Sequence, residues 1–206
     1  MLIIKKCLTC IKQIHKMAES IPITIPTFNF SVEAYHKMAE IGIIKPTDRV
    51  ELIEGKIITM SPMKSAHAAC VRRLGDILRH IAGVKVIISE EKAITLNNHS
   101  EPQPDITIAK YRDDYYEMAH PTPSDIFVLI EVALSTQKYD RETKVPLYAS
   151  YNIPEVWVVD LKEKTIEVYE NPKGEAYTSK KIFGLNDVLK SSFVEQLAVN
   201  RVIKSK

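Results

Sequence analysis

The sequence has little of several features that would assign a protein to a class at once. Its 206 residues include three cysteines, one tryptophan and six glycines. Three cysteines are too few for a disulfide-rich secreted domain. The net charge of +2 excludes a strongly basic protein that binds polyanions by bulk charge alone. No apolar run reaches the roughly 18 residues that a membrane-spanning helix needs, so we expect no membrane association and a cytoplasmic location.

The small net charge is unevenly distributed. Residues 1–20 contain four lysines against Glu19, a net charge of +3, which leaves −1 for residues 21–206. Apolar residues recur among these lysines at helical spacing, but the apolar stretch is too short for a signal peptide. Pro22 and Pro26 exclude a helix over residues 21–27. We therefore expect an N-terminal extension and linker over residues 1–27 and one domain over residues 28–206.

Two of the three cysteines form a CxxC pair near the N-terminus. Cys7 and Cys10 have the spacing of half a zinc site or of a redox motif. A closed zinc site needs four ligands, and the sequence has no second CxxC pair. The pair is therefore expected to be two reduced thiols without a function of their own.

Hydrophobic periodicity and turn residues predict helices that alternate with strands. Ser31 is a suitable N-cap for the first helix. Gly42 is suited to end the first helix, and Gly83 to end the second. Pro146 fits the third helix only in its first turn or at a kink. The predicted helices cover residues 31–42, 66–81 and 141–152, and the strands cover a hairpin at 50–61 and segments 84–91, 92–97, 104–110, 126–134, 155–161 and 165–171. This order predicts an α/β (α+β) domain with a mixed central sheet flanked by helices.

The segment IFVLIEVAL, residues 126–134, contains one residue that does not fit its surroundings. Eight of its nine residues are apolar, and Glu131 is the exception. A strand that is apolar on both faces belongs in the middle of a sheet. An ionised carboxylate in that position is costly unless it is paired with a cation or bound to a metal. Glu131 is therefore expected to have charged partners from other segments.

Three residues are candidates for these partners. Asp105 begins the strand predicted at 104–110, and ligands bind at strand ends in sheets of this type. Lys144 lies on the helix that directly follows the Glu131 strand. Asp140 is four residues before Lys144, which places both on the same helix face. Asp140 could therefore join the site or simply pair with Lys144.

The first predicted hairpin supplies two further carboxylates, Glu51 and Glu54, which flank its first strand. Carboxylates from adjacent strands together with a lysine form a site of hard oxygen ligands, which suits Mg²⁺. A cation held there activates water and shields the charge of a phosphate oxygen. The lysine can orient the water or stabilise developing negative charge.

Several stretches of the chain resemble the Uma2 family, a group of restriction-endonuclease-like proteins common in cyanobacteria. The resemblance runs from about residue 31 to residue 175 and follows the order of the family's motifs. The matching stretches are SVEAYHKMAE, ELIEGKIITMSP with His67 after it, PDITIAK, IEVALSTQKYDRETKVPLYASYNIPEVWVVD and TIEVYENPKG.

This resemblance implies a PD-(D/E)xK nuclease core and assigns roles to individual residues. Asp105 matches the acid of the PD motif, Glu131 the second acid, and Glu51 an acid of the first hairpin. The literal position of the motif's lysine is occupied by Ala133, so the resemblance places the lysine on the following helix, at Lys144.

The implied activity is hydrolysis of DNA phosphodiester bonds by an endonuclease that depends on Mg²⁺ or Mn²⁺. Asp105, Glu131 and Glu51 are the expected metal ligands, and Lys144 assists the attacking water. Glu54, His67 and Asp140 are accessory candidates. A homodimer is expected because cutting both strands of a duplex favours two sites related by a two-fold axis. We expect no membrane partner and no small-molecule cofactor.

The residues also allow interpretations without catalysis. The chain could be an inactive nuclease-fold module that binds DNA or regulates another protein, which its weakly charged body favours, or a self-associating structural protein. Glu131 and Lys144 could form a buried structural ion pair. His67, at the start of a helix, fits a capping or surface role. Tyr148 and Tyr151 are interpreted as packing residues on one helix face.

Overall fold

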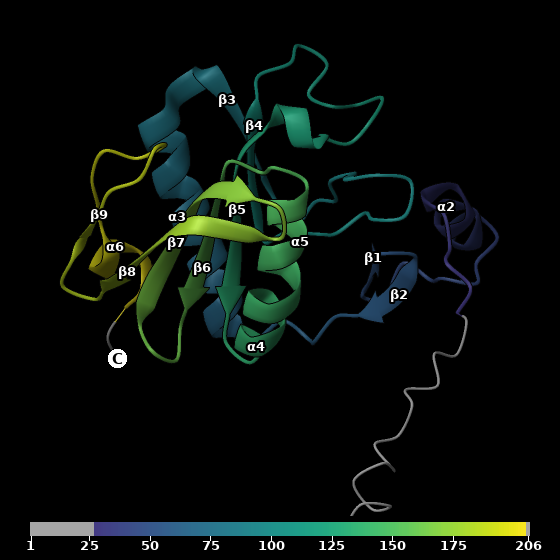
Figure 1. Ribbon diagram of the computed structural model, residues 1–206, viewed down its shortest axis with the longest axis horizontal. Coiled ribbons are helices and arrows are strands. Elements are labelled where there is room, and N and C mark those ends of the chain that lie inside the picture. Colours follow the sequence, from purple (N-terminus) through teal and green to yellow (C-terminus); the bar gives the residue numbers. More distant parts are fainter. Residues whose placement is uncertain (1–26, 205–206) are drawn as a thin grey trace, which may run out of the picture.

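The computed structural model describes residues 27–204 and contains a six-stranded mixed sheet (Figure 1). The strand order is β3-β4-β5-β6-β7-β8; β5 and β6 are parallel, and the other pairs are antiparallel. The sheet strands are β3 (Val86–Glu90), β4 (Ile106–Lys110), β5 (Ile126–Ala133), β6 (Glu155–Asp160), β7 (Thr165–Lys173) and β8 (Ala176–Gly184). The mixed sheet and the central place of the Glu131 strand confirm the predicted fold class.

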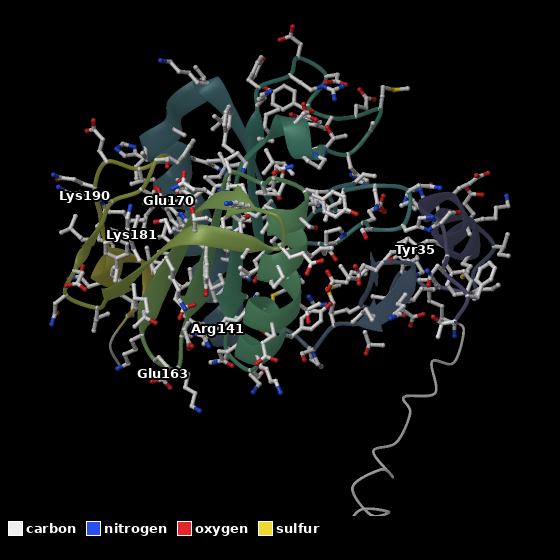
Figure 2. All side chains as sticks on the ribbon, in the orientation of Figure 1. Tyr35, Arg141, Glu163, Glu170, Lys181 and Lys190 are labelled. Atoms are coloured by element: carbon white, nitrogen blue, oxygen red, sulfur yellow. The ribbon has the colours of Figure 1, made fainter. Side chains whose placement is uncertain are left out.

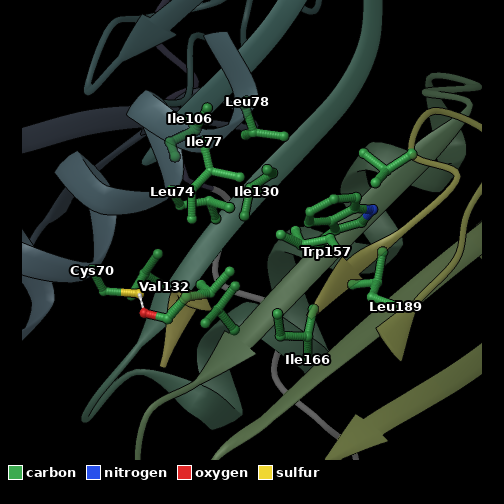
Figure 3. Close-up of a cluster of buried hydrophobic side chains, with 14 of the residues drawn as sticks. Cys70, Leu74, Ile77, Leu78, Ile106, Ile130, Val132, Trp157, Ile166 and Leu189 are labelled. Carbon is green, nitrogen blue, oxygen red and sulfur yellow. Dashed lines mark hydrogen bonds between the residues drawn. The ribbon is translucent and has the colours of Figure 1, made fainter. Parts of the chain in front are cut away.

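Helices cover both faces of this sheet. On one face, α3 (Ser65–Ala82) packs with Leu74 and Leu78 against apolar residues of β4, β5 and β6. Figure 3 shows this cluster, with the fully buried Trp157 of β6 among its members. On the other face, α5 (Val145–Ser150) packs against alternate residues of β5 and β6. Both faces of β5 are therefore buried, as its continuous apolar sequence requires.

The N-terminal elements form a separate layer beside the sheet (Figure 1). Helix α2 (Val32–Glu40) begins after Ser31, whose side chain accepts a hydrogen bond from the Ala34 N–H at 3.1 Å, as the sequence predicted. A hairpin of β1 (Val50–Ile53) and β2 (Lys56–Thr59) follows. The Tyr35 hydroxyl donates to the Val50 carbonyl at 3.0 Å and links the helix to the hairpin. Tyr35 is labelled in Figure 2.

The predicted helix at 141–152 is interrupted by a π turn. The observed helical segment begins before the predicted start, with α4 (Gln137–Tyr139), continues as η3 (Asp140–Lys144), and ends as α5. Pro146 lies in the first turn of α5 and has no N–H for an ordinary helical bond. The Val145 N–H instead donates to the Asp140 carbonyl, five residues back. The π turn contains Asp140 and Lys144, both buried.

Short elements complete the fold. A two-stranded sheet of β9 (Val188–Leu189) and β10 (Leu197–Ala198) packs with α6 (Val199–Val202) on the side that α3 covers. The 3₁₀ turns are η1 (Gly83–Lys85) and η2 (Pro123–Asp125). Among residues 27–204, the structure has no helix that is both long and apolar enough to cross a membrane.

Two details of the predicted sheet are wrong. Residues 92–97 are extended but do not form a strand; the Ile94 N–H donates to the Pro102 carbonyl, and Pro102 and Pro104 have no N–H to complete a ladder. The sheet also continues beyond residue 171 to β8. This edge strand is mostly exposed and carries lysines, which protect an open sheet edge from pairing with another chain. Because it lacks a clear alternation of apolar and polar residues, its sequence did not predict a strand.

The CxxC pair and the expected N-terminal extension lie outside the described residues, apart from residue 27.

Candidate active site

A cavity of about 540 Å³ lies beside the ends of β4 and β5. The β1–β2 hairpin and the segment leading into α3 supply one part of its lining, and α4 and η3 supply another. Every acid expected at the site except Glu54 lines this cavity. Its polar lining includes Glu51, His67, Glu91, Asp105, Glu131, Asp140 and Lys144. Glu54 instead lies in the exposed hairpin turn, with a φ of 48°, and does not line the cavity, so its accessory role stays a prediction.

Lys144 bridges two buried carboxylates. Its Nζ lies 3.2 Å from Glu51 Oε2 and 3.2 Å from Glu131 Oε1. The side chains of Lys144, Glu51 and Glu131 are 6%, 1% and 4% exposed, so solvent screens these pairs weakly. Two tyrosines also bind the carboxylates: the Tyr148 hydroxyl donates to Glu131 Oε1 at 2.6 Å, and the Tyr139 hydroxyl donates to Glu51 Oε1 at 3.3 Å.

The charges of this group depend on one another. Burial alone would lower the pKa of Lys144, but the carboxylates of Glu131 and Glu51 outweigh burial and hold the pKa above its usual value. Burial raises the pKa of Glu131, and the Lys144 ammonium acts against that rise. Burial also raises the pKa of Asp140, to about 6, although Thr136 donates a hydrogen bond to its carboxylate at 2.6 Å. Lys144 is therefore a fixed positive charge among carboxylates.

Asp105 reaches the same cavity from the strand next to Glu131. Ile106 pairs with Ile130 in the antiparallel register of β4 and β5, so Asp105 comes opposite Glu131 one position further. The Val132 N–H donates to Asp105 Oδ2 at 2.6 Å and fixes the carboxylate at the end of the sheet. Asp105, one residue before β4, thus lies opposite Glu131 of β5, close to the adjacent-strand arrangement expected from the sequence; their sharing of one ion stays a prediction.

His67 and Glu91 complete a second group around Asp105. His67 Nε2 lies 3.1 Å from Asp105 Oδ2. Burial alone would lower the pKa of His67, but the hydrogen bond to Asp105 and the negative charges of Asp105 and Glu91 together raise it. The Glu91 N–H donates to the Asp105 carbonyl at 3.0 Å. One ligand atom from each of His67, Glu91 and Asp105 lies within 4.8 Å of the other two. His67 therefore points into the site, and neither of the roles suggested by its position at a helix start, capping or surface, applies.

Glu91, Tyr139 and Tyr148 were not predicted as site residues from the sequence. Glu91 is the last residue of the predicted strand 84–91 and directly follows β3, but only the pairing of β3 with β4 places it beside Asp105. Tyr148 was interpreted as packing, although it stands four residues after Lys144. That spacing puts both side chains on one helix face and could have indicated a shared carboxylate partner.

Comparison with known proteins agrees with this architecture. Residues 32–201 match the Uma2 family, described as "Putative restriction endonuclease". A solved structure, "a putative nuclease belonging to DUF820 from Anabaena variabilis ATCC 29413", has a TM-score of 0.65 and 18% sequence identity. The similarity covers 84% of this chain and 97% of that one. No curated protein matches the chain.

The family match includes the residues that line the cavity, from Arg49 to Lys144. It also includes the six strands of the central sheet and the helices on both its faces. The chain therefore belongs to the Uma2 family, and it shares its fold with the Anabaena variabilis protein.

Proposed function

We propose that this protein is an endonuclease that hydrolyses DNA phosphodiester bonds with the help of Mg²⁺ or Mn²⁺. The observation that carries the proposal is the convergence of Asp105, Glu131, Glu51 and Lys144 from four separate segments on one cavity. Ionisable residues that are buried together in a cavity, with perturbed pKa values, are typical of catalytic sites. Family membership supports the same reaction class.

The residues around Asp105 fit a divalent cation. Three ligand atoms, from His67, Glu91 and Asp105, already lie close enough together to surround one ion. Glu91 Oε1 is buried and has no hydrogen-bond partner among the described residues, and such an atom is costly to leave unsatisfied. Two carboxylates suit Mg²⁺ or Mn²⁺, whereas an imidazole is a better ligand for transition metals. The set therefore favours Mn²⁺ over Mg²⁺.

Each side chain of the site has a role in this proposal. A bound divalent cation would make a water molecule a stronger nucleophile and neutralise charge on the phosphate. Asp105, with its carboxylate fixed by the Val132 N–H, holds that cation, and Glu91 and His67 assist it. The ammonium of Lys144 supplies positive charge for the phosphate oxygens in the transition state. Glu51 and Glu131 keep Lys144 charged and in place.

A cleavage assay tests the proposal directly. Purified full-length protein is incubated with supercoiled plasmid and with labelled oligonucleotides, in EDTA, Mg²⁺ or Mn²⁺. We expect no cleavage in EDTA and nicked or linear plasmid with at least one of the two metals. Substrates that stay intact in both metals, with a protein that is folded by circular dichroism, would contradict an endonuclease.

The metal ligands can be tested without activity. A ligand at 100 times its Kd stabilises the folded state by about 2.7 kcal/mol, which raises the melting temperature by about 5–10 °C for a domain of this size. We expect Mn²⁺ to cause such a shift in the wild type and a much smaller one in Glu91→Gln. Glu117→Gln, an exposed carboxylate on the loop before β5, is the matched control. A normal shift in Glu91→Gln together with a lost shift in Glu131→Gln would favour the ligand set expected from sequence.

A second candidate is a nuclease-fold module that binds DNA or regulates another protein without cutting. The observation that favours it is the pairing of Lys144 with Glu51 and Glu131, which gives both carboxylates a cationic partner without any metal. Binding of DNA with no cleavage in any metal would select this module.

A two-fold homodimer is also a proposal, and sedimentation at micromolar concentration measures the oligomeric state.

A further inference from the structure

The cavity has two chemically different sides. The carboxylates and Lys144 occupy its deep side, while the segment from Met60 to Lys64, between β2 and α3, lines the outer side. This segment, MSPMK, has no regular secondary structure and presents Met63, which is 37% exposed. Ile58 and Leu134 extend the apolar lining. An apolar wall of this kind has no use in binding a phosphate and is suited to the face of a planar ring.

The charge around the cavity is unfavourable for a polyanion. Without a bound cation, the lining carries six carboxylates against four lysines and arginines, a formal net charge of −2, and Lys144 is already held in two ion pairs. The carboxylates are Glu51, Glu91, Asp105, Glu131, Asp140 and Glu142, and the cations are Arg49, Lys64, Lys138 and Lys144. A duplex brings two phosphate-lined strands to the site and needs a broad basic surface. One phosphate and its nucleoside need far less positive charge.

The depth of the reactive groups also favours a single nucleotide over a duplex. Glu131 and Lys144 have side chains 4% and 6% exposed, so a phosphate must enter the cavity to reach them. A volume of about 540 Å³ lies in the range of pockets that hold a single small ligand. A nucleotide that stays stacked and paired in a duplex cannot enter such a pocket, and enzymes with this problem use single strands or extrude one nucleotide.

We infer that the cavity accepts one unpaired nucleotide, with its phosphodiester at Asp105 and Lys144 and its base against the wall formed by Met60, Pro62 and Met63. This inference rests on the proposed function and names its substrate class: a single-stranded or locally unpaired nucleic acid. Methionine side chains adapt to different ring shapes, so the contact tolerates any base. The preference also removes the reason for a dimer that cuts both strands of a duplex together.

Binding of labelled oligonucleotides to the full-length protein tests the inference independently of cleavage. Fluorescence anisotropy is measured in Ca²⁺ with a 15-nucleotide oligothymidylate, a mixed-sequence single strand and the blunt duplex of that sequence. We expect both single strands to bind at least about tenfold more tightly than the duplex. The double variant Met60→Ser/Met63→Ser is expected to weaken single-strand binding about tenfold, because it removes apolar contact with the base.

Met118→Ser is the matched control, because Met118 is 85% exposed on the loop before β5 and does not line the cavity. Its single-strand affinity is expected to equal that of the wild type. A duplex that binds as tightly as the single strands would overturn the inference, and so would a Met60→Ser/Met63→Ser variant with wild-type affinity. Neither result bears on whether the protein is a nuclease, which the plasmid assay decides separately.

Discussion

Replacing Lys144 with alanine is expected to reduce both stability and cleavage. The change leaves Glu51 and Glu131 buried, close together and without their shared cation, which costs about 3–5 kcal/mol of unfolding free energy. Cleavage should fall by about 10²-fold or more, because the lost charge acts mainly in the transition state. Urea denaturation and the plasmid assay measure the two effects.

Two further variants separate the causes. Lys138→Ala removes an exposed lysine of the same helical segment, paired with Glu142 at 3.8 Å, and should change stability by less than about 0.5 kcal/mol. Lys144→Met keeps the apolar stem and removes only the charge, so it shows how much of the loss is electrostatic. Wild-type stability in both Lys144 variants would mean that the bridging ion pairs do not stabilise the fold. A large stability loss without any wild-type cleavage would make the group a structural ion-pair core.

Replacing Asp105 with asparagine is expected to abolish metal-dependent cleavage and leave the fold intact. The asparagine side-chain oxygen can still accept the hydrogen bond from the Val132 N–H, so the stability change should stay below about 1 kcal/mol. The lost negative charge weakens the cation site, and cleavage should drop by about 10²–10³-fold. The Mn²⁺-dependent rise in melting temperature should disappear in the same variant.

The matched control for Asp105→Asn is Asp48→Asn. Asp48 is exposed and follows α2, and its Oδ2 accepts a hydrogen bond from the Lys45 N–H at 2.9 Å. It should keep both cleavage and the melting shift. If Asp105→Asn retained the melting shift but lost cleavage, the cation would bind elsewhere and Asp105 would act on the substrate itself.

Local sequence patterns are sufficient to predict the layered fold and the most unusual residue of the site. The helix at α2, with Ser31 and Gly42 at its ends, and the central place of β5 depend on local patterns of capping and apolar spacing. Glu131 was identified because a carboxylate inside a strand that is apolar on both faces is costly wherever that strand lies. Both results need only the neighbouring residues in the chain.

The tertiary structure alone decided which side chains meet Glu131 and Asp105. Glu91 reaches Asp105 through the pairing of β3 with β4, and Glu51 reaches Lys144 from a hairpin more than ninety residues away in sequence. Such contacts depend on strand order, register and hairpin placement, and no local pattern encodes them. The π turn that carries Asp140 and Lys144 lies just before Pro146, where the sequence predicted only a first-turn proline or a kink. A sequence can thus show that a buried charge needs partners, but strand order and packing determine which residues they are.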